Sequence, residues 1–163
     1  MTGRRAVLDE TLVALRQSAD RLGATHRAVA RSFPLTSVRL TALPQPAQER
    51  LDAYAIRYAR CQDLLFPAMR ALARAQLEPK ADGSFLELHG LMQKQGIVTS
   101  TADWERQRVL RNAVGHQYPD PDSITDILNG IHAATPEVLG VVQRLREAAA
   151  RLAGDAGLGT ESE

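Results

Sequence analysis

The sequence is poor in cysteine, in aromatic residues and in long apolar runs. Its single cysteine, Cys61, excludes an intrachain disulfide and a cysteine-based zinc site, and it favours a reducing cytoplasm as the compartment. No apolar run approaches the length needed to cross a bilayer, and an amphipathic pattern follows the N-terminus, so we expect no membrane segment and no signal peptide. Only 4% of the residues are aromatic, which argues against a β-sandwich or barrel.

Alanine, leucine, arginine and glutamate are abundant instead, a mixture that favours helices. The 163 residues suit a single domain, and 44% of them are hydrophobic, which supplies a core. The formal net charge is only +1, so overall charge does not mark the chain as a nucleic-acid binder. The charge is uneven, however, because residues 1–60 hold ten arginines against five acidic residues. This asymmetry is typical of a polarised surface or a heterologous partner.

Two stripes of apolar residues predict two long helices, over about 8–31 and 46–77. In both stripes the apolar residues recur at alternating spacings of three and four, and one loop joins the two segments, so we expect an antiparallel pair. Pro34 closes the first helix, and Pro67 predicts a kink in the second helix or a break near Phe66. The first stripe is Leu8, Leu12, Leu15, Ala19, Leu22, His26, Val29 and Phe33, and the second is Leu51, Tyr54, Tyr58, Cys61, Leu65, Ala68 and Leu72.

Two shorter helices are expected next, and their ends carry specific signals. Ser84 and Glu87 form the Ser-x-x-Glu pattern of a capping box. Gly96 suits the left-handed cap at the end of that helix. Ser100 or Thr101 is expected to cap the following helix.

A last helix is expected to begin at Ser123 as its cap and to run to about residue 153. Pro136 interrupts the pattern, which predicts either two collinear helices or one kinked helix. Residues 154–163 are expected to form a flexible tail. The sequence thus predicts an all-α fold, an up-and-down antiparallel helical bundle, with residues 1–153 as one domain.

The most specific segment is Arg-Asn-Ala-Val-Gly-His-Gln-Tyr, residues 111–118, where a helical pattern ends at a glycine. Arg111 carries a permanent cationic fork that suits phosphate. His116 can take and release protons near neutral pH. The Tyr118 hydroxyl is a candidate ligand, nucleophile or modification site. Together these residues indicate chemistry on a phosphodiester.

A helical wheel with about 100° per residue places Arg111 and Trp104 away from the core face of this helix. A tryptophan outside the core favours a second interface, so we expect the chain to dimerise through this helix. Gly115 is expected to adopt a left-handed turn, which lets His116 fold back towards Arg111. The expected core face is Ala102, Val109, Leu110, Ala113 and Val114.

The same residue types also have structural explanations. Arginine and histidine are common near helix C-termini because both cations favour the negative end of the helix dipole. His26 lies on an apolar stripe, where a buried or interfacial histidine is expected rather than a catalyst. His89 and His132 lack the neighbours of a metal site, and Asp120 and Asp122 are expected to be turn formers. We expect neither a metal nor a cofactor.

Residues 111–118 resemble the R-x-x-x-x-H-x-Y motif of the HEPN superfamily (higher eukaryotes and prokaryotes nucleotide-binding), and in particular its HepT-like branch. The polar Asn112 after the arginine also fits that pattern, as does a motif late in an all-helical chain. The resemblance implies a metal-independent RNA endonuclease that acts as a homodimer. His116 would be the general acid or base, Arg111 would bind the scissile phosphate, and Asn112 would position these groups or the RNA.

The resemblance also implies a partner and a control mechanism. HepT-like proteins form toxin–antitoxin modules with minimal nucleotidyltransferases, which transfer AMP to the tyrosine of the motif, here Tyr118. The implied function is therefore an RNA endonuclease toxin neutralised by a nucleotidyltransferase antitoxin. The alternative is a non-catalytic subunit of the same fold that binds RNA or a nucleotide for such a partner.

Overall fold

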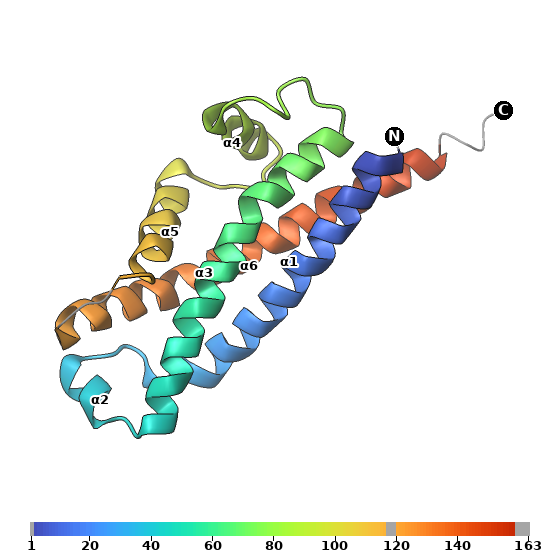
Figure 1. Ribbon diagram of the computed structural model, residues 1–163. Helices are drawn as coiled ribbons and strands as arrows, with labels where there is room; N and C mark the ends of the chain where they lie inside the picture. The colour runs from blue at the N-terminus through green and yellow to red at the C-terminus, as the bar shows by residue number, and fades with distance from the viewer. Residues whose placement is uncertain (1, 117–119, 159–163) are drawn as a thin grey trace.

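The computed structural model describes residues 2–116 and 120–158, and within these ranges the chain is helical and contains no strand (Figure 1). This confirms the expected all-α class. The elements are α1 (Thr2–Val29), the short 3-10 helix η1 (Ala30–Ser32), α2 (Ser37–Ala42), α3 (Gln45–Ala75), α4 (Phe85–Lys94), α5 (Thr101–Ala113) and α6 (Pro121–Leu158).

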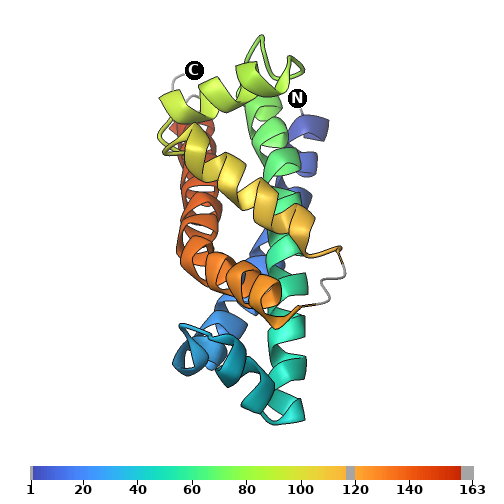
Figure 2. The same cartoon turned by 90° about the vertical axis from the view of Figure 1, so that its left-hand side faces the viewer.

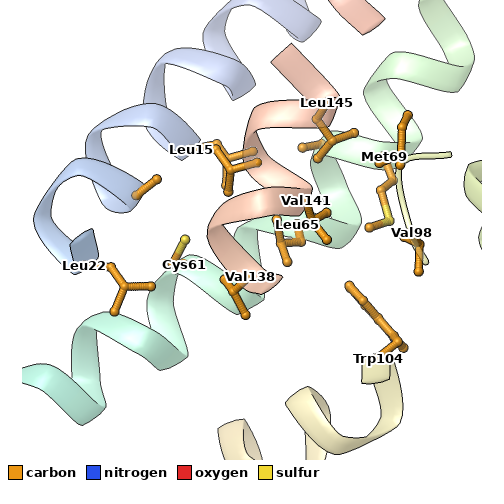
Figure 3. Packing of buried hydrophobic residues seen from close by; sticks show 14 of the residues in the cluster. Leu15, Leu22, Cys61, Leu65, Met69, Val98, Trp104, Val138, Val141 and Leu145 are labelled. Carbon is orange, nitrogen blue, oxygen red and sulfur yellow. The ribbon is translucent and has the colours of Figure 1, made fainter. Parts of the chain in front are cut away.

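The helices α1 and α3 lie side by side and antiparallel, and α6 packs against both (Figure 1). Both apolar stripes face this centre, as the sequence predicts. Their middle residues are buried because each stripe has a neighbouring helix to cover it. The core residues that Figure 3 labels come from three long helices and the segment around α5, and they are Leu15, Leu22, Cys61, Leu65, Met69, Val98, Trp104, Val138, Val141 and Leu145.

The prolines inside the long helices have different consequences. The helix α3 continues through Pro67, so the predicted break near Phe66 is wrong. Leu65, Ala68 and Met69 around this proline are buried in the core, and their packing offsets the lost backbone hydrogen bond. The helix α6 also continues through Pro136 but changes direction along its length (Figure 2), as in the kinked alternative.

The loop between the first two long helices contains α2, which the sequence did not predict. Thr36 caps this helix by accepting a hydrogen bond from the backbone N–H of Arg39. Asn129 of α6 fixes the loop because its side chain exchanges two hydrogen bonds, of 2.8 and 2.9 Å, with the backbone of Leu35. The loop is therefore tied to the start of α6.

Most expected helix ends are confirmed. The Ser84–Glu87 capping box is present, and Gly96 has a positive φ of 71°. Ser100, rather than its neighbour, caps α5 through a hydrogen bond from the backbone N–H of Asp103.

The expected cap of the last helix is wrong. Ser123 is not its N-cap, because its backbone N–H and hydroxyl both donate to the carboxylate of Asp120, which caps the helix. Pro121 at the first helical position suits this start, since its missing N–H would have no partner there. At its other end α6 extends to Leu158, beyond the expected end near 153. Residues 159–163 of the expected tail lie outside the described residues.

Candidate functional site

The helix α5 lies across α3 and α6 (Figure 2), and the face that it presents to them matches the predicted face only in part. Trp104 is only 3% exposed, whereas Val109 is 68% exposed. Trp104 reaches from α5 into the core (Figure 3), with its ring centroid 6.1 Å from that of Phe85 and 6.0 Å from that of His89. The expected core face is therefore right for Leu110 and Val114, which pack against the core, and wrong for Ala102 and Val109, because burying the large indole outweighs burying a valine and an alanine. Trp104 is therefore not available for a second interface.

This rotation of α5 directs Arg111 towards α3. The Arg111 Nε and Nη2 atoms donate to the two carboxylate oxygens of Asp63, at 2.5 and 2.7 Å. Such a bidentate pair is the geometry in which a guanidinium binds either a carboxylate or a phosphate. Hydrogen bonding to Asp63 raises the pKa of Arg111, which stays a cation at all physiological pH values. The Arg111 and Asp63 side chains are 32% and 41% exposed, so solvent reaches the pair.

A second arginine shares the same acidic residue. Arg108 lies one helical turn before Arg111 and donates to Gln62 Oε1 at 2.9 Å and to Asp63 Oδ1 at 3.4 Å. One carboxylate therefore faces two guanidinium groups at this site. Neither Arg108 nor Asp63 belongs to the motif that the sequence singles out. The spacing of three between Arg108 and Arg111 was a usable signal, since it places both on one helix face.

The helix ends without the expected left-handed turn. In the described ranges the only glycine with a positive φ is Gly96, so the prediction for Gly115 is wrong. Instead the chain continues in a right-handed turn, in which the backbone N–H of His116 donates to Ala113 O at 3.1 Å. No positive φ is needed because this hydrogen bond closes the turn with ordinary backbone angles.

His116 is exposed and lines an open hollow of about 210 Å³ between α3, α5 and α6. Asp52 of α3 lines the same hollow, and apolar residues of α6 form its floor. Asp52 and the Arg111 partner Asp63 are eleven residues apart on α3, which is about 16 Å along a helix axis. The structure thus directs Arg111 and His116 towards separate stretches of α3.

Of the two remaining motif residues, Asn112 and Tyr118, the structure describes only Asn112. Asn112 is exposed on the outer face of α5, beside the exposed Val109. Tyr118, the expected modification site, lies outside the described residues, as do its two neighbours. The described part of the motif is therefore a surface feature from Arg111 to His116.

A separate polar network surrounds His26 inside the bundle. His26 Nδ1 lies 2.7 Å from the Tyr54 hydroxyl, which in turn lies 2.8 Å from Thr135 Oγ1. The His132 ring stacks between His26 and Phe33, at centroid distances of 4.6 and 4.1 Å. Burial lowers the pKa of His26 and His132 and raises the pKa of Tyr54 to about 12. His26 is half-buried and contacts the buried Tyr54, which fits the expected structural role better than a catalytic one.

Comparisons of the chain with protein-family models, with curated proteins and with solved structures give no match. Across residues 2–116 and 120–158, no group of three potential ligand side chains is placed to hold a metal ion. No helix in that part of the chain is both long and apolar enough to cross a membrane. The case for function therefore rests on the residues and their geometry.

Proposed function

We propose that the protein is a metal-independent RNA endonuclease of the HEPN type, with Arg111 and His116 acting on the scissile phosphate. The observation that carries the proposal is the Arg111 guanidinium, which binds two oxygens of one oxyanion at a solvent-accessible site. A phosphodiester also presents two non-bridging oxygens to such a fork. The exposed His116 follows on the same helix end, as the resemblance of the motif requires.

The chemistry needs a base, an acid and a cation. His116 takes the proton from the RNA 2′-hydroxyl, and the oxygen then attacks the adjacent phosphorus. Arg111 stabilises the extra negative charge on the phosphoryl oxygens as the bond to the 5′-oxygen breaks. A second acid returns a proton to that leaving oxygen, giving a cyclic phosphate and a 5′-hydroxyl. DNA lacks the 2′-hydroxyl and is not cut.

We further propose that the catalytic unit is a homodimer. A two-fold axis brings a second His116 to the cleft, so that one histidine acts as base and the other as acid. The separate directions of Arg111 and His116 within one chain support this arrangement, since a two-fold axis can bring the arginine of one chain close to the histidine of the other. The exposed face of α5 at Val109 and Asn112 is the contact we propose, in place of Trp104.

The proposed regulation is AMP transfer to Tyr118 by a minimal nucleotidyltransferase antitoxin. The added AMP would bring negative charge and bulk two residues from His116 and exclude RNA. Intact-mass measurement after incubation with the partner and ATP tests this step. The Tyr118→Phe variant should gain no AMP, and a gain by this variant would place the modification elsewhere.

A second function is supported by Asp63, whose carboxylate already occupies Arg111. An arginine that is neutralised in this way suits a non-catalytic subunit that binds RNA or a nucleotide for a partner. Labelled RNA incubated with the protein and a chelator separates the two functions. Cleavage that His116→Ala abolishes supports the endonuclease, whereas binding without cleavage supports the binding subunit.

The arginine needs a matched control in the same assay. Arg111→Ala should lower the cleavage rate by roughly 10²- to 10³-fold, the effect of removing one group that stabilises the transition state. Arg106→Ala serves as the control because Arg106 lies on the same helix, is exposed and pairs with Asp103 of its own helix. Equal losses in the two variants would contradict a specific role for Arg111.

A further inference from the structure

An open hollow of about 480 Å³ lies between α1 and α3, on the far side of Asp63 from α5. Its polar lining comes from one face of each helix: Gln17, Ser18 and Arg21 on α1, and Arg57, Arg60 and Asp63 on α3. The antiparallel packing of α1 and α3 sets these residues side by side. One contact between the two helices here is the hydrogen bond that Arg57 donates to Thr25 Oγ1. The hollow is thus a local gap on the surface between two helices that pack closely against each other along the rest of their length.

The charge of this hollow is strongly unbalanced. Three arginines line it, and among the described residues none of the three has a carboxylate within ion-pair distance. The one carboxylate of the lining, Asp63, is already bound by Arg111 and Arg108 from the other side. Guanidinium groups held close together without counter-charges repel one another, and an anion between them relieves that repulsion.

We infer that this hollow binds the phosphodiester backbone of a single-stranded nucleic acid, which continues past Asp63 to Arg111. The inference deepens the proposed function and rests on it for the path of the strand from the hollow towards Arg111. The arginines form a continuous series on the surface, with Arg21, Arg57 and Arg60 in the hollow and Arg108 and Arg111 across Asp63. Proteins bind single strands without sequence preference through a cationic groove that follows the backbone, together with aromatic side chains that stack on the bases, and the hollow supplies the first of these two features.

Uncharged donors in the lining favour this ligand over an acidic protein. Gln17 and Ser18 supply an amide and a hydroxyl, which hydrogen-bond to phosphate and sugar oxygens in nucleic-acid interfaces. Among the described residues, the lining holds no aromatic side chain, and its apolar members are Ala14 and Leu64, which offer a protein segment little to anchor on. Phosphate contacts alone would hold a strand here in a strongly salt-dependent manner.

The test measures binding of a fluorescein-labelled 2′-O-methyl oligonucleotide by anisotropy, from about 50 to about 200 mM salt. The 2′-O-methyl group blocks cleavage, so binding is read independently of catalysis. The test variant is Arg21→Gln/Arg60→Gln, since both residues are exposed and carry no structural ion pair. The control variant is Arg146→Gln/Arg151→Gln, two exposed arginines of α6 that do not line the hollow.

The test variant should bind about 50-fold more weakly near 50 mM salt, the counterion-release effect of two lost phosphate contacts on a single strand. Its slope of log affinity against log salt should be shallower by about 1.4. The control variant should stay within about threefold of wild type, because it changes net charge equally but not the hollow. Equal losses in both variants, or no binding by wild type, would overturn the inference.

Two competitors identify the ligand chemistry. Unlabelled oligonucleotide should displace the probe, whereas tripolyphosphate and a polyglutamate peptide at equal charge concentration should displace it much less. If polyglutamate competes as well as the oligonucleotide, the hollow is a site for acidic protein and the inference is wrong. If tripolyphosphate competes equally well, the hollow is a site for free phosphate and the inference is also wrong.

The outcome is separable from that of the proposed function. Wild type that binds the probe through the hollow but does not cut unmodified RNA leaves this inference standing and contradicts the endonuclease. Wild type that cuts RNA with the same KM as Arg21→Gln/Arg60→Gln contradicts the inference alone.

Discussion

The pairing of Arg111 with Asp63 leads to opposite expectations for its two members. Suppose that the Asp63 carboxylate occupies the position where a phosphate of the RNA binds. Asp63→Asn then frees the Arg111 guanidinium for catalysis, whereas Arg111→Ala removes this cation. If the pair only joins α3 to α5, both substitutions lose the same interaction. The two variants therefore distinguish a functional arginine from a structural one.

The structural cost of either change is small. Both side chains are substantially exposed, and exposed ion pairs contribute about 0.2 to 1 kcal/mol, reduced further by salt. For a chain of this size 1 kcal/mol corresponds to about 2–4 °C in Tm. We expect thermal denaturation to give a small, similar decrease in Tm for both variants.

The functional effects differ widely. Asp63→Asn removes a negative charge that competes with RNA phosphate for Arg111. The interaction of two unit charges about 4 Å apart in water is worth about 1 kcal/mol, so RNA binding should strengthen by up to about fivefold. Arg111→Ala should reduce RNA cleavage by about 10²- to 10³-fold. Parallel cleavage and anisotropy assays measure both effects. Similar losses of RNA binding and cleavage in the two variants would refute the reasoning.

Three further predictions concern the packing of α5, its exposed face and two half-buried histidines. Trp104→Ala should destabilise the fold by about 3–5 kcal/mol, measured by chemical denaturation, because the indole is 3% exposed in the core; a loss below about 1 kcal/mol would contradict this placement. If the proposed dimer forms through α5, Val109→Glu should leave stability nearly unchanged but shift the mass in light scattering from dimer to monomer, whereas Val38→Glu, at a 77% exposed valine of α2, should not change the mass. Burial lowers the pKa of His26 and His132 below that of the unfolded chain. The free energy of unfolding that the neutral histidines provide is therefore complete above about pH 6.5 and is lost as pH falls below that value. Tm should decrease below pH 6.5, and less steeply in His26→Gln.

The sequence predicted the long helices well because their stripes are regular over many turns. Leu15 and Leu65 are buried as expected, and the capping box at Ser84 is a local pattern that needs no tertiary information. Local chemistry of this kind is readable from a single chain. The short helix α2 was missed because its position depends on hydrogen bonds between Leu35 and Asn129, which are far apart in the sequence.

The candidate site was harder to predict for a physical reason. A short helix such as α5 can bury more than one face, and the wheel weighted alanines and a valine above a single tryptophan. Burial of Trp104 rotated the helix and turned Arg111 towards Asp63, a residue on another helix. Neither the ion pair nor the arginine-lined hollow beside it can be read from spacing, because both depend on how the helices are placed in space.

The central claim is that His116 and Arg111 cut RNA without a metal. The most direct measurement incubates labelled RNA, and DNA of the same sequence, with wild type and with His116→Ala in the presence of a chelator. We expect wild type to cut only the RNA, to leave a cyclic phosphate end, and to lose about 10²- to 10⁴-fold of this activity in His116→Ala, as for loss of a general acid or base. RNA left intact by wild type, or cut equally by His116→Ala, would contradict the claim.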